Sequence, residues 1–490
     1  MVYSFKTPGV YYRETTRGNI AAPLAAHDRV YMLGYSATGV AGQLKEVTSS
    51  LDFFNQFGAS ASTNSVKLFF AQRHGKPLHF LNVPIRSSYS VDITTVTSGE
   101  TYTLTIAGLA VSHVATGSDT ETTVLTQLAN KVNTTLSVVA DMVVSGGSAI
   151  LRVNQGTTVV AGTGVTLGSV STPTYPTASD VIQAMELLPK RLDIGFIIAP
   201  EFFQSYTSST DRTNLANEMI AFASDPRRLW VAIIDCGAAI ADNTATGGSV
   251  SAVQVEKATL QDPRGHGAYY FPYWKDINNN VVPQSAAVTG VALRRMMQEG
   301  FTQPPAGTEF PVYGVNDTTF EVTDTIQDIL NPLNINCARV FLGDFGRVIY
   351  GARTLSPNPY VRYVSQRVVC NVLGRTLVDA CKTLVLSTVD GTGLTFNRVY
   401  ITAVGVCERI RRAGGLFGVD AASAYLVVCD LTNNLPDDLA NGIVRCLVAV
   451  KLSPVLEFLD INVVTTSLGE VFAQVVTQAG DAQDEEPEEE

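Results

Sequence analysis

The chain has 490 residues, too many for a single hydrophobic core, and its length predicts two to four domains. Its hydrophobic content of 46%, with no charge-dense stretch before the C-terminal tail, indicates a globular protein and excludes an intrinsically disordered one. The formal net charge is −11, and the seven acids among the last ten residues supply −7 of it, which leaves the remainder near −4. A net charge of this small size and negative sign excludes the excess of basic surface on which nucleic-acid binding depends.

The seven cysteines are scattered and odd in number, and no two of them form a CxxC pair. We therefore expect reduced core residues of a cytosolic product and no metal site. The N-terminus lacks the charged head and apolar run of a secretory signal, and no uninterrupted apolar segment of about 18 residues occurs. We expect neither a signal peptide nor insertion into a membrane.

Residues 1–20 consist of short strand-like pieces at 2–6 and 10–14, which flank Pro8 and Gly9 and are followed by turn-prone residues. The residues alone favour an ordinary first strand of the same chain. An arm that reaches a neighbouring chain is the alternative.

Residues 21–85 and 173–330 are predicted to form one discontinuous α/β domain. Apolar strands alternate there with amphipathic helices, which implies a sheet with helices packed against it. The predicted strands are Arg29–Gly34, Leu78–Val83, Asp193–Ala199, Leu229–Asp235 and Ala268–Tyr273, and the predicted helices are Leu51–Phe57, Asp180–Leu188, Arg212–Ala223, Ala252–Leu260 and Gln284–Gln298. Phosphate-binding glycine patterns are missing.

Residues 86–172 interrupt that domain and are predicted to form an inserted β-rich domain. Ser, Thr, Gly and Val dominate, and alternation is the main period, as at Tyr102, Leu104 and Ile106. One helix-like segment, Thr122–Val132, breaks the strands. Insertions are tolerated at surface loops, so we place this domain on such a loop.

Residues 331–478 are predicted to form a C-terminal domain in which a mixed sheet carries two amphipathic helices. Apolar residues recur at helical spacing at Val361, Val364, Val368 and Val372, and again at Val399, Ala403, Val406 and Ile410. The glycines at 414 and 415 are expected to end the second helix.

Two strands are predicted after these helices. Gly442–Leu452 places apolar residues at every even position from Val444, and Glu457–Thr465 places Leu459, Ile461 and Val463 on one side. An isolated pair of strands is marginal in water. We therefore expect this sheet to take further strands from elsewhere in the chain or from another chain.

A series of short motifs runs through most of the chain in a fixed order. The motifs are Thr7–Tyr11, Ala268–Trp274, Val282–Pro283, Gly290–Arg294, Ile335–Asn336, Gly351–Leu355, Gly414–Gly418, Ala424–Asp430, Thr432–Asn434, Asn441–Gly442 and Pro454–Phe458. No single motif is specific, but their order resembles that of the contractile tail sheath protein family.

The resemblance implies a structural subunit that forms stacked six-fold rings around an inner tail tube and contracts to drive the tube through a target envelope. It also implies two arms that complete the sheets of neighbours. The N-terminal arm would use Pro8, Gly9, Val10 and Tyr11, and the C-terminal arm, about 456–475, would use Leu459, Ile461 and Val463.

The implied partners are further copies of the chain, the tube protein, and baseplate and tail terminator proteins. The implied localisation is the virion tail, after assembly in the host cytoplasm. The insert would face outward, and no cofactor or nucleic acid is implied.

Arg409 and Arg412 are the candidates for contact with the tube. They lie three residues apart on the helix face opposite Ala403, Val406 and Ile410. The residues alone favour a solvated helix end, where cations also complement the helix dipole. Because sheath proteins attach to the tube through the C-terminal domain, the resemblance adds tube contact as a second interpretation.

The sequence predicts no enzyme, since nucleotide-binding, zinc-protease and hydrolase motifs are missing. Asp235, at the expected carboxyl end of a strand, occupies a position where α/β enzymes keep catalytic groups, but no base, nucleophile or metal partner accompanies it. A sheath from a non-phage injection system and an adhesin built around the insert are also compatible with the sequence. The acidic tail, 479–490, is expected to be disordered and solubilising.

Overall fold

The computed structural model describes residues 23–463, with gaps at 137–138, 146, 172, 190–192, 243, 245–247, 342, 344–345, 391–392 and 462. The chain divides after Ser453, so that the segment from Pro454 onward is a separate unit. The predicted fold class is confirmed, because α/β and α+β folding occur in different parts of the chain. Among the described residues, no helix has the length and apolar content that crossing a membrane requires.

An eight-stranded mixed sheet forms the centre of the body, by which we mean the α/β part of the chain, residues 23–85 and 173–363. Its strands are, in spatial order, β18 (Gly346–Tyr350), β17 (Ile335–Phe341), β13 (Gly267–Phe271), β12 (Val231–Asp235), β11 (Ile194–Ile198), β1 (His27–Gly34), β3 (Leu78–Asn82) and β2 (Leu44–Val47). The six central strands run parallel, and each edge strand runs antiparallel to its neighbour. The five strands predicted for the α/β domain all lie in this sheet.

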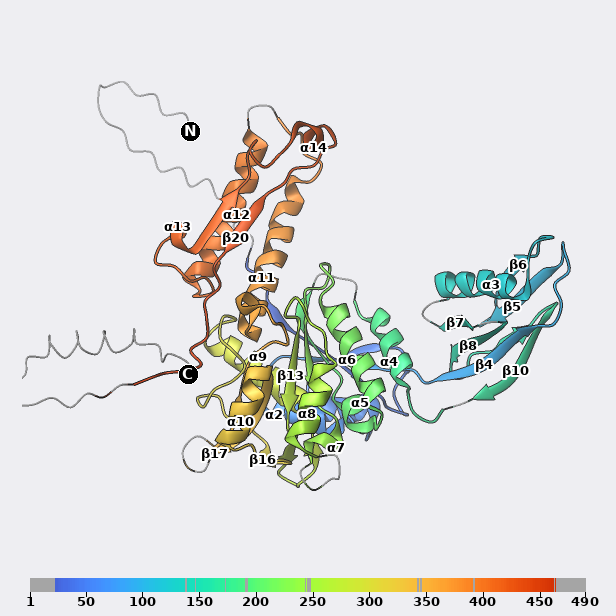
Figure 1. Cartoon of the computed structure of the whole chain (residues 1–490), viewed down its shortest axis with the longest axis horizontal. Coiled ribbons are helices and arrows are strands. Elements are labelled where there is room, and N and C mark those ends of the chain that lie inside the picture. Colours follow the sequence, from blue (N-terminus) through green and yellow to red (C-terminus); the bar gives the residue numbers. More distant parts are fainter. Residues whose placement is uncertain are drawn as a thin grey trace, which may run out of the picture. The chain divides into compact units, whose positions relative to one another are not determined.

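Helices cover both faces of the large sheet (Figure 1). One face packs against α1 (Ser50–Phe57), α2 (Thr63–Ala71), α9 (Gln284–Gln298) and α11 (Val364–Cys381), and the other against α4 (Ala178–Ala184), α5 (Pro200–Ser205), α6 (Ser209–Ala223), α7 (Ala238–Ala241), α8 (Val250–Ala258) and α10 (Asp324–Leu330). Val30 and Met32 of β1 face the first set, whereas Tyr31 and Leu33 face the second. Burial on both faces explains why the central strands are continuous apolar runs.

β17 and β18 lie in the range that the sequence assigned to the C-terminal domain, yet they extend the sheet of the body. β17 pairs in parallel with β13, and β18 returns antiparallel to β17. The loop-rich stretch before them contributes β16 (Val315–Thr318) to a small sheet with β14 (Trp274–Asp276) and β15 (Val281–Val282). Short 3-10 helices occur at η1 (Met185–Leu187), η2 (Asn331–Leu333), η3 (Pro359–Val361) and η4 (Lys382–Leu384).

The insert contains two antiparallel sheets and one helix. One sheet has the order β10 (Val165–Ser171), β4 (Arg86–Ile93), β8 (Ser148–Asn154) and β7 (Ala140–Ser145), and the other β6 (Leu109–Val114), β5 (Thr101–Ile106) and β9 (Val159–Ala161). α3 (Glu121–Thr135) is the predicted helix, and Figure 1 shows it beside the strands. Its buried residues share one core with Tyr102, Leu104 and Ile106, so the predicted β-rich character is confirmed.

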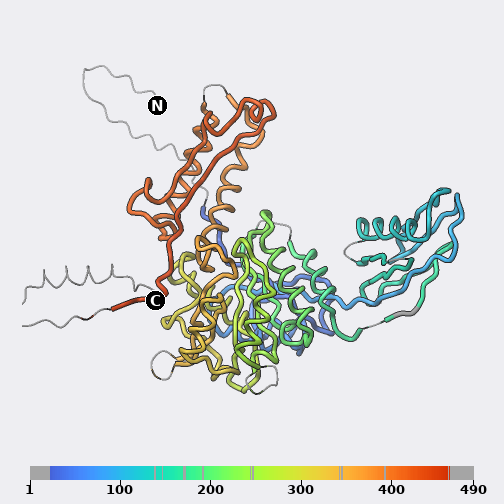
Figure 2. Tube along the Cα trace, viewed as in Figure 1, coloured from blue at the N-terminus to red at the C-terminus, as the bar shows by residue number. Residues whose placement is uncertain are grey.

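The C-terminal domain begins with α11 and α12 (Leu394–Arg412), which lie side by side in Figures 1 and 2. The elements that follow are α13 (Ala421–Ala424), β19 (Tyr425–Val428), α14 (Pro436–Ala440) and β20 (Leu447–Val450). α11 serves two cores, because Val364, Val368 and Val372 pack on the body whereas Val369 and Leu373 pack with α12. After α12, Gly414 takes a φ of +81°, the left-handed conformation that favours glycine at a helix end.

Candidate functional site

The C-terminal sheet consists of β19 and β20 alone within the described part of the chain. The two strands pair antiparallel, from Tyr425↔Val450 to Val428↔Leu447. The predicted alternation is confirmed: the even positions from 444 to 452 are half-buried, and the odd positions between them are exposed. The ladder covers only Leu447–Val450 of the predicted strand, because its partner β19 is four residues long.

One face of this sheet is covered and the other is open. Val427, Val448 and Val450 belong to the apolar cluster shared with α11 and α12. On the opposite face Leu426 is 57% exposed and Leu447 is 55% exposed. Each strand is also an edge, so its outer backbone groups are available to another strand.

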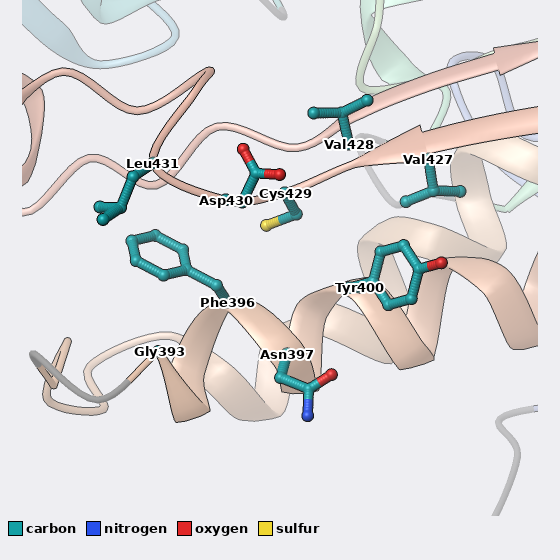
Figure 3. A pocket seen from close by; sticks show the side chains of 9 residues that line it. All are labelled: Gly393, Phe396, Asn397, Tyr400, Val427, Val428, Cys429, Asp430 and Leu431. Carbon is teal, nitrogen blue, oxygen red and sulfur yellow. The ribbon is translucent and has the colours of Figure 1, made fainter.

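A cavity of about 400 Å³ lies between the first turns of α12 and the end of β19. Figure 3 shows the rings of Phe396 and Tyr400 extending from α12 toward Val427 of β19 and toward Cys429 and Leu431, which follow that strand. The lining is mixed in character, since Asn397 and Asp430 contribute polar groups. A chain docking beside β19 would therefore meet both backbone groups and a pocket of mixed polar and apolar character.

The segment after Ser453 exposes the side chains that the sequence predicted for the C-terminal arm. Leu459 is 70% exposed, Ile461 71% and Val463 79%, and Phe458 is similarly open. Residues 457–461 and 463 are the described part of the strand predicted at Glu457–Thr465, and they carry no strand pairing. A strand needs a partner for its hydrogen bonds. Residues 464–475 lie outside the described residues.

The N-terminal arm residues Pro8, Gly9, Val10 and Tyr11 also lie outside the described residues. The first described residues are held on α11. The Ala25 amide donates to Thr376 Oγ1 at 3.0 Å, and Leu24 packs against both the body core and the C-terminal core. The described part of the chain therefore begins where the body meets the C-terminal domain.

The end of α12 carries Arg409, Arg411 and Arg412. Arg412 is 74% exposed and its Nε lies 2.8 Å from Glu408 Oε1, while Arg409 is half-buried and donates to the Gly405 carbonyl at 3.3 Å. Arg411 binds both carboxylate oxygens of Glu408, at 2.8 and 2.9 Å.

Hydrogen bonds from Arg411 and Arg412 lower the pKa of Glu408 to about 2. Glu408 was missed by the sequence analysis, although its i+3 and i+4 spacing to these arginines is a recognisable signal. The negative charge of Glu408 offsets part of the charge of the three arginines, so the end of α12 keeps a smaller net positive charge.

Asp235, the residue on which an enzymatic alternative depended, is structural in its contacts. It ends β12 and is 1% exposed, and its carboxylate accepts from the Ser285 amide at 2.8 Å and from Ser285 Oγ. Burial raises the pKa of Asp235 to about 7. The carboxyl of Asp235 thus caps the start of α9. Among the described residues, no cluster of three or more His, Cys, Asp or Glu side chains is arranged to hold a metal ion.

No family model matches the chain. The tail sheath protein of Vibrio phage KVP40 is 22% identical over 282 residues, which are 54% of this chain and 39% of that protein, so the match spans about two fifths of the relative's length. The solved PVC sheath complex of an extracellular contractile injection system, in its contracted state, has a TM-score of 0.56 at 16% identity and covers 96% of this chain and 99% of its own. The contracted helical sheath of the anti-feeding prophage has a TM-score of 0.58 at 18% identity, over 94% and 100%.

Proposed function

We propose, from the premise that this chain resembles contractile tail sheath proteins in sequence and has their fold, that it is a structural subunit of a contractile sheath. Copies would polymerise around an inner tube as stacked hexameric rings and contract to drive the tube through a target envelope. The role is mechanical, and we propose no catalytic activity.

The observation that carries this proposal is the unfinished C-terminal sheet. It has two strands, two free edges within the described residues, and one open apolar face. Such a pair is marginal by itself, and additional strands would supply both the hydrogen bonds and the missing cover. A chain that leaves this surface open and also carries an exposed apolar segment is suited to assembly with copies of itself.

We propose that the two arms supply those strands in neighbouring subunits. The C-terminal arm would place Leu459, Ile461 and Val463 on one face of an added strand, since side chains alternate along a strand. The N-terminal arm, with Pro8, Gly9, Val10 and Tyr11, would add to the other edge of a second neighbour. Leu24 and Ala25, among the first described residues, contact α11 and the core that carries the accepting sheet.

Arg409 and Arg412 are proposed to contact the tube. Exposed ion pairs are individually weak, so each contact can break when the subunit moves. Many copies along the tube would still hold it by avidity. No nucleotide is required, because the energy for contraction would be stored in a metastable extended lattice and released when the subunits repack.

The comparisons support two settings for such a sheath. KVP40 is a phage, whereas the PVC and anti-feeding prophage structures are contractile injection assemblies. We propose a phage tail first, with assembly in the host cytoplasm and contacts to baseplate and tail terminator proteins, and the non-phage injection system as the second candidate. An anti-feeding prophage baseplate structure is also similar, with a TM-score of 0.55. An adhesin built around the insert is less favoured, because it would not need the open C-terminal sheet.

Electron microscopy of the purified chain, with and without the tube protein, tests the proposal. We expect striated cylinders or stacked rings from the intact chain. Deletion of residues 1–14, or truncation after Ser453, should leave folded monomers that no longer assemble. Truncation before Asp481 is the matched control, since it removes only the acidic tail and should retain assembly. Unchanged polymers after both arm deletions would overturn the arm exchange.

Co-sedimentation with the tube tests the arginine contact separately. The double variant Arg409→Ala, Arg412→Ala should still self-assemble but should bind the tube more weakly, with a smaller dependence on salt. Arg227→Ala is a matched control, because Arg227 is an exposed arginine of the body. Equal tube binding by both variants would contradict the assignment of Arg409 and Arg412.

A further inference from the structure

Two cysteines lie directly beyond the paired ends of the strands, Cys429 after β19 and Cys446 before β20. The ladder ends at the pair Val428↔Leu447, and the next pair in the same register is Cys429 and Cys446. Cys446 packs with the apolar cluster on α12, and Cys429 is 5% exposed on the same face of the sheet. The pair thus lies between the sheet and the helices that carry it.

The hydrogen-bond pattern places this pair at a narrow position of the ladder. The Lys451 amide donates to the Ala424 carbonyl at 2.9 Å, which makes Ala424 and Lys451 a hydrogen-bonded pair. Such pairs alternate with non-hydrogen-bonded ones, so Cys429 and Cys446 fall on a non-hydrogen-bonded pair, where opposite Cα atoms are about 4.5 Å apart. A disulfide spans Cα separations of about 4.4–6.8 Å, so the position allows one.

Cys429 and Cys446 are close enough for each thiol to influence the pKa of the other. Cys381 of α11 and Cys407 of α12 lie within electrostatic range of Cys446. All four are free thiols. Two thiols this close can react together as a dithiol, and the register favours Cys429 and Cys446 over any pairing with the helices.

The cavity beside α12 gives access to this pair. Cys429 is one of its lining residues, and Figure 3 shows the sulfur directed into the space above Phe396. Cys446 is half-buried, whereas Cys429 is 5% exposed. A small reagent could reach the dithiol without unfolding the domain.

We propose that Cys429 and Cys446 are a redox-active dithiol that a small external disulfide oxidises to a cross-strand disulfide. The Cys446 thiolate attacks the reagent R–S–S–R, forming a mixed disulfide and releasing one thiolate. The Cys429 thiolate then displaces the second thiolate from the Cys446 sulfur. The protein loses two protons and two electrons, and the reagent becomes two R–SH. This inference does not rest on assembly into a sheath.

The pKa values of the two thiols determine how fast this oxidation runs at a given pH. Burial raises the pKa of both thiols, that of Cys429 to about 12, and the hydrogen bond from Cys429 opposes the rise at Cys446. Both are therefore protonated near neutral pH, and oxidation should be slow there and faster as the pH rises.

The disulfide would change the two-stranded sheet of the C-terminal domain. It would close the loop 430–445 and join the ends of two strands that otherwise depend on a short ladder. Restricting the open state in this way should slow amide exchange at Val428 and Leu447 by about tenfold or more.

Thiol counting on the purified full chain tests the proposal. After reduction, removal of reductant and exposure to oxidised glutathione, we expect the free thiols of the denatured chain to fall from seven to five. Non-reducing peptide mapping should identify one link, between Cys429 and Cys446. Seven remaining thiols, a stable mixed disulfide, or a link from Cys446 to Cys381 or Cys407 would overturn the proposal.

Single variants give the control. Cys429→Ser and Cys446→Ser should each keep six thiols through the same treatment, apart from reversible glutathione adducts. Cys370→Ser removes a half-buried cysteine of α11 and should fall from six to four. Because the peptide map is made on the unmodified chain, the proposal can be decided even if a variant folds poorly. Retention of six thiols by Cys370→Ser would contradict it.

Discussion

The body and the C-terminal domain differ in how completely they bury their apolar side chains. The eight-stranded sheet of the body has helices on both faces, and its core residues are almost wholly buried. The two-stranded sheet of the C-terminal domain has helices on one face only, and Leu426 and Leu447 remain open on the other. Apolar burial is the main source of stability, so the body is complete by itself and the C-terminal domain is not.

The ion pairs of the two domains also differ in how deeply they are buried. In the body, Arg212 and Glu256 form a buried ion pair, and Glu256 also accepts from the Tyr269 hydroxyl at 2.6 Å and from the Gly237 amide at 3.0 Å. In the C-terminal domain, Glu408 and Arg411 are partly exposed, and Arg412, which also pairs with Glu408, is largely exposed. Buried charges with every partner in place specify one structure, whereas exposed charges stay available to a second molecule.

The largest test of this contrast is a core truncation in the body. Phe80→Ala removes a fully buried ring whose centroid lies 4.9 Å from that of Phe53 and 4.7 Å from that of Phe57. We expect the free energy of unfolding to fall by about 5 kcal/mol, from lost burial and the cavity left behind. Denaturant unfolding measures it. Leu426→Ala, on the open face of β19, is the matched control and should cost less than about 0.5 kcal/mol in the monomer. Similar losses for both would contradict the contrast.

A second test concerns the pH dependence of the body. The folded pKa of Asp235, about 7, is raised by burial above its usual value of 3.8, so the folded state holds a proton that the unfolded state releases. Stability should therefore fall as the pH rises from about 4 to about 7, by up to about 4 kcal/mol.

Asp235→Asn keeps both contacts with Ser285 and should abolish this contribution. The difference in unfolding free energy between variant and wild type isolates it, because the buried His27, His74 and His266, whose lowered pKa values act in the opposite direction, are common to both. Parallel stability curves from pH 4 to 7 would refute the assignment.

The sequence predicted the complete parts of the molecule better than the incomplete ones. Central strands such as Ile194–Ile198 and helices such as Gln284–Gln298 carry their own apolar pattern, and local periodicity was enough to find them. β17 was assigned to another domain, because its pairing with β13 joins residues far apart in sequence.

The candidate site shows the same limit. The alternation in 442–452 predicted which side chains of β20 face inward, but the length of a strand is set by its partner, and β19 supplies only four residues. The pattern Leu459, Ile461 and Val463 predicts a strand, and the described residues 457–461 and 463 carry no strand pairing. Periodicity identifies the face that a segment will bury, and it cannot say which chain will bury it.

The smallest expected effect on the monomer, and the sharpest on partner binding, comes from Glu408→Gln. Glu408 is partly exposed and its partner Arg412 largely so, and ion pairs that water reaches contribute little stability, so the midpoint of unfolding should change only slightly. Its lowered pKa, about 2, keeps Glu408 ionised at ordinary pH. The stability that depends on the charge is lost only as the pH falls from the usual glutamate range toward that value.

Removing the charge of Glu408 leaves the end of α12 more positive, and tube binding should become more dependent on salt in co-sedimentation. Asp379→Asn, which breaks the comparable pair with Arg375 on α11, should change neither property. If the two variants behave alike toward the tube, the end of α12 is a solvated helix terminus and the contact must lie elsewhere on the domain.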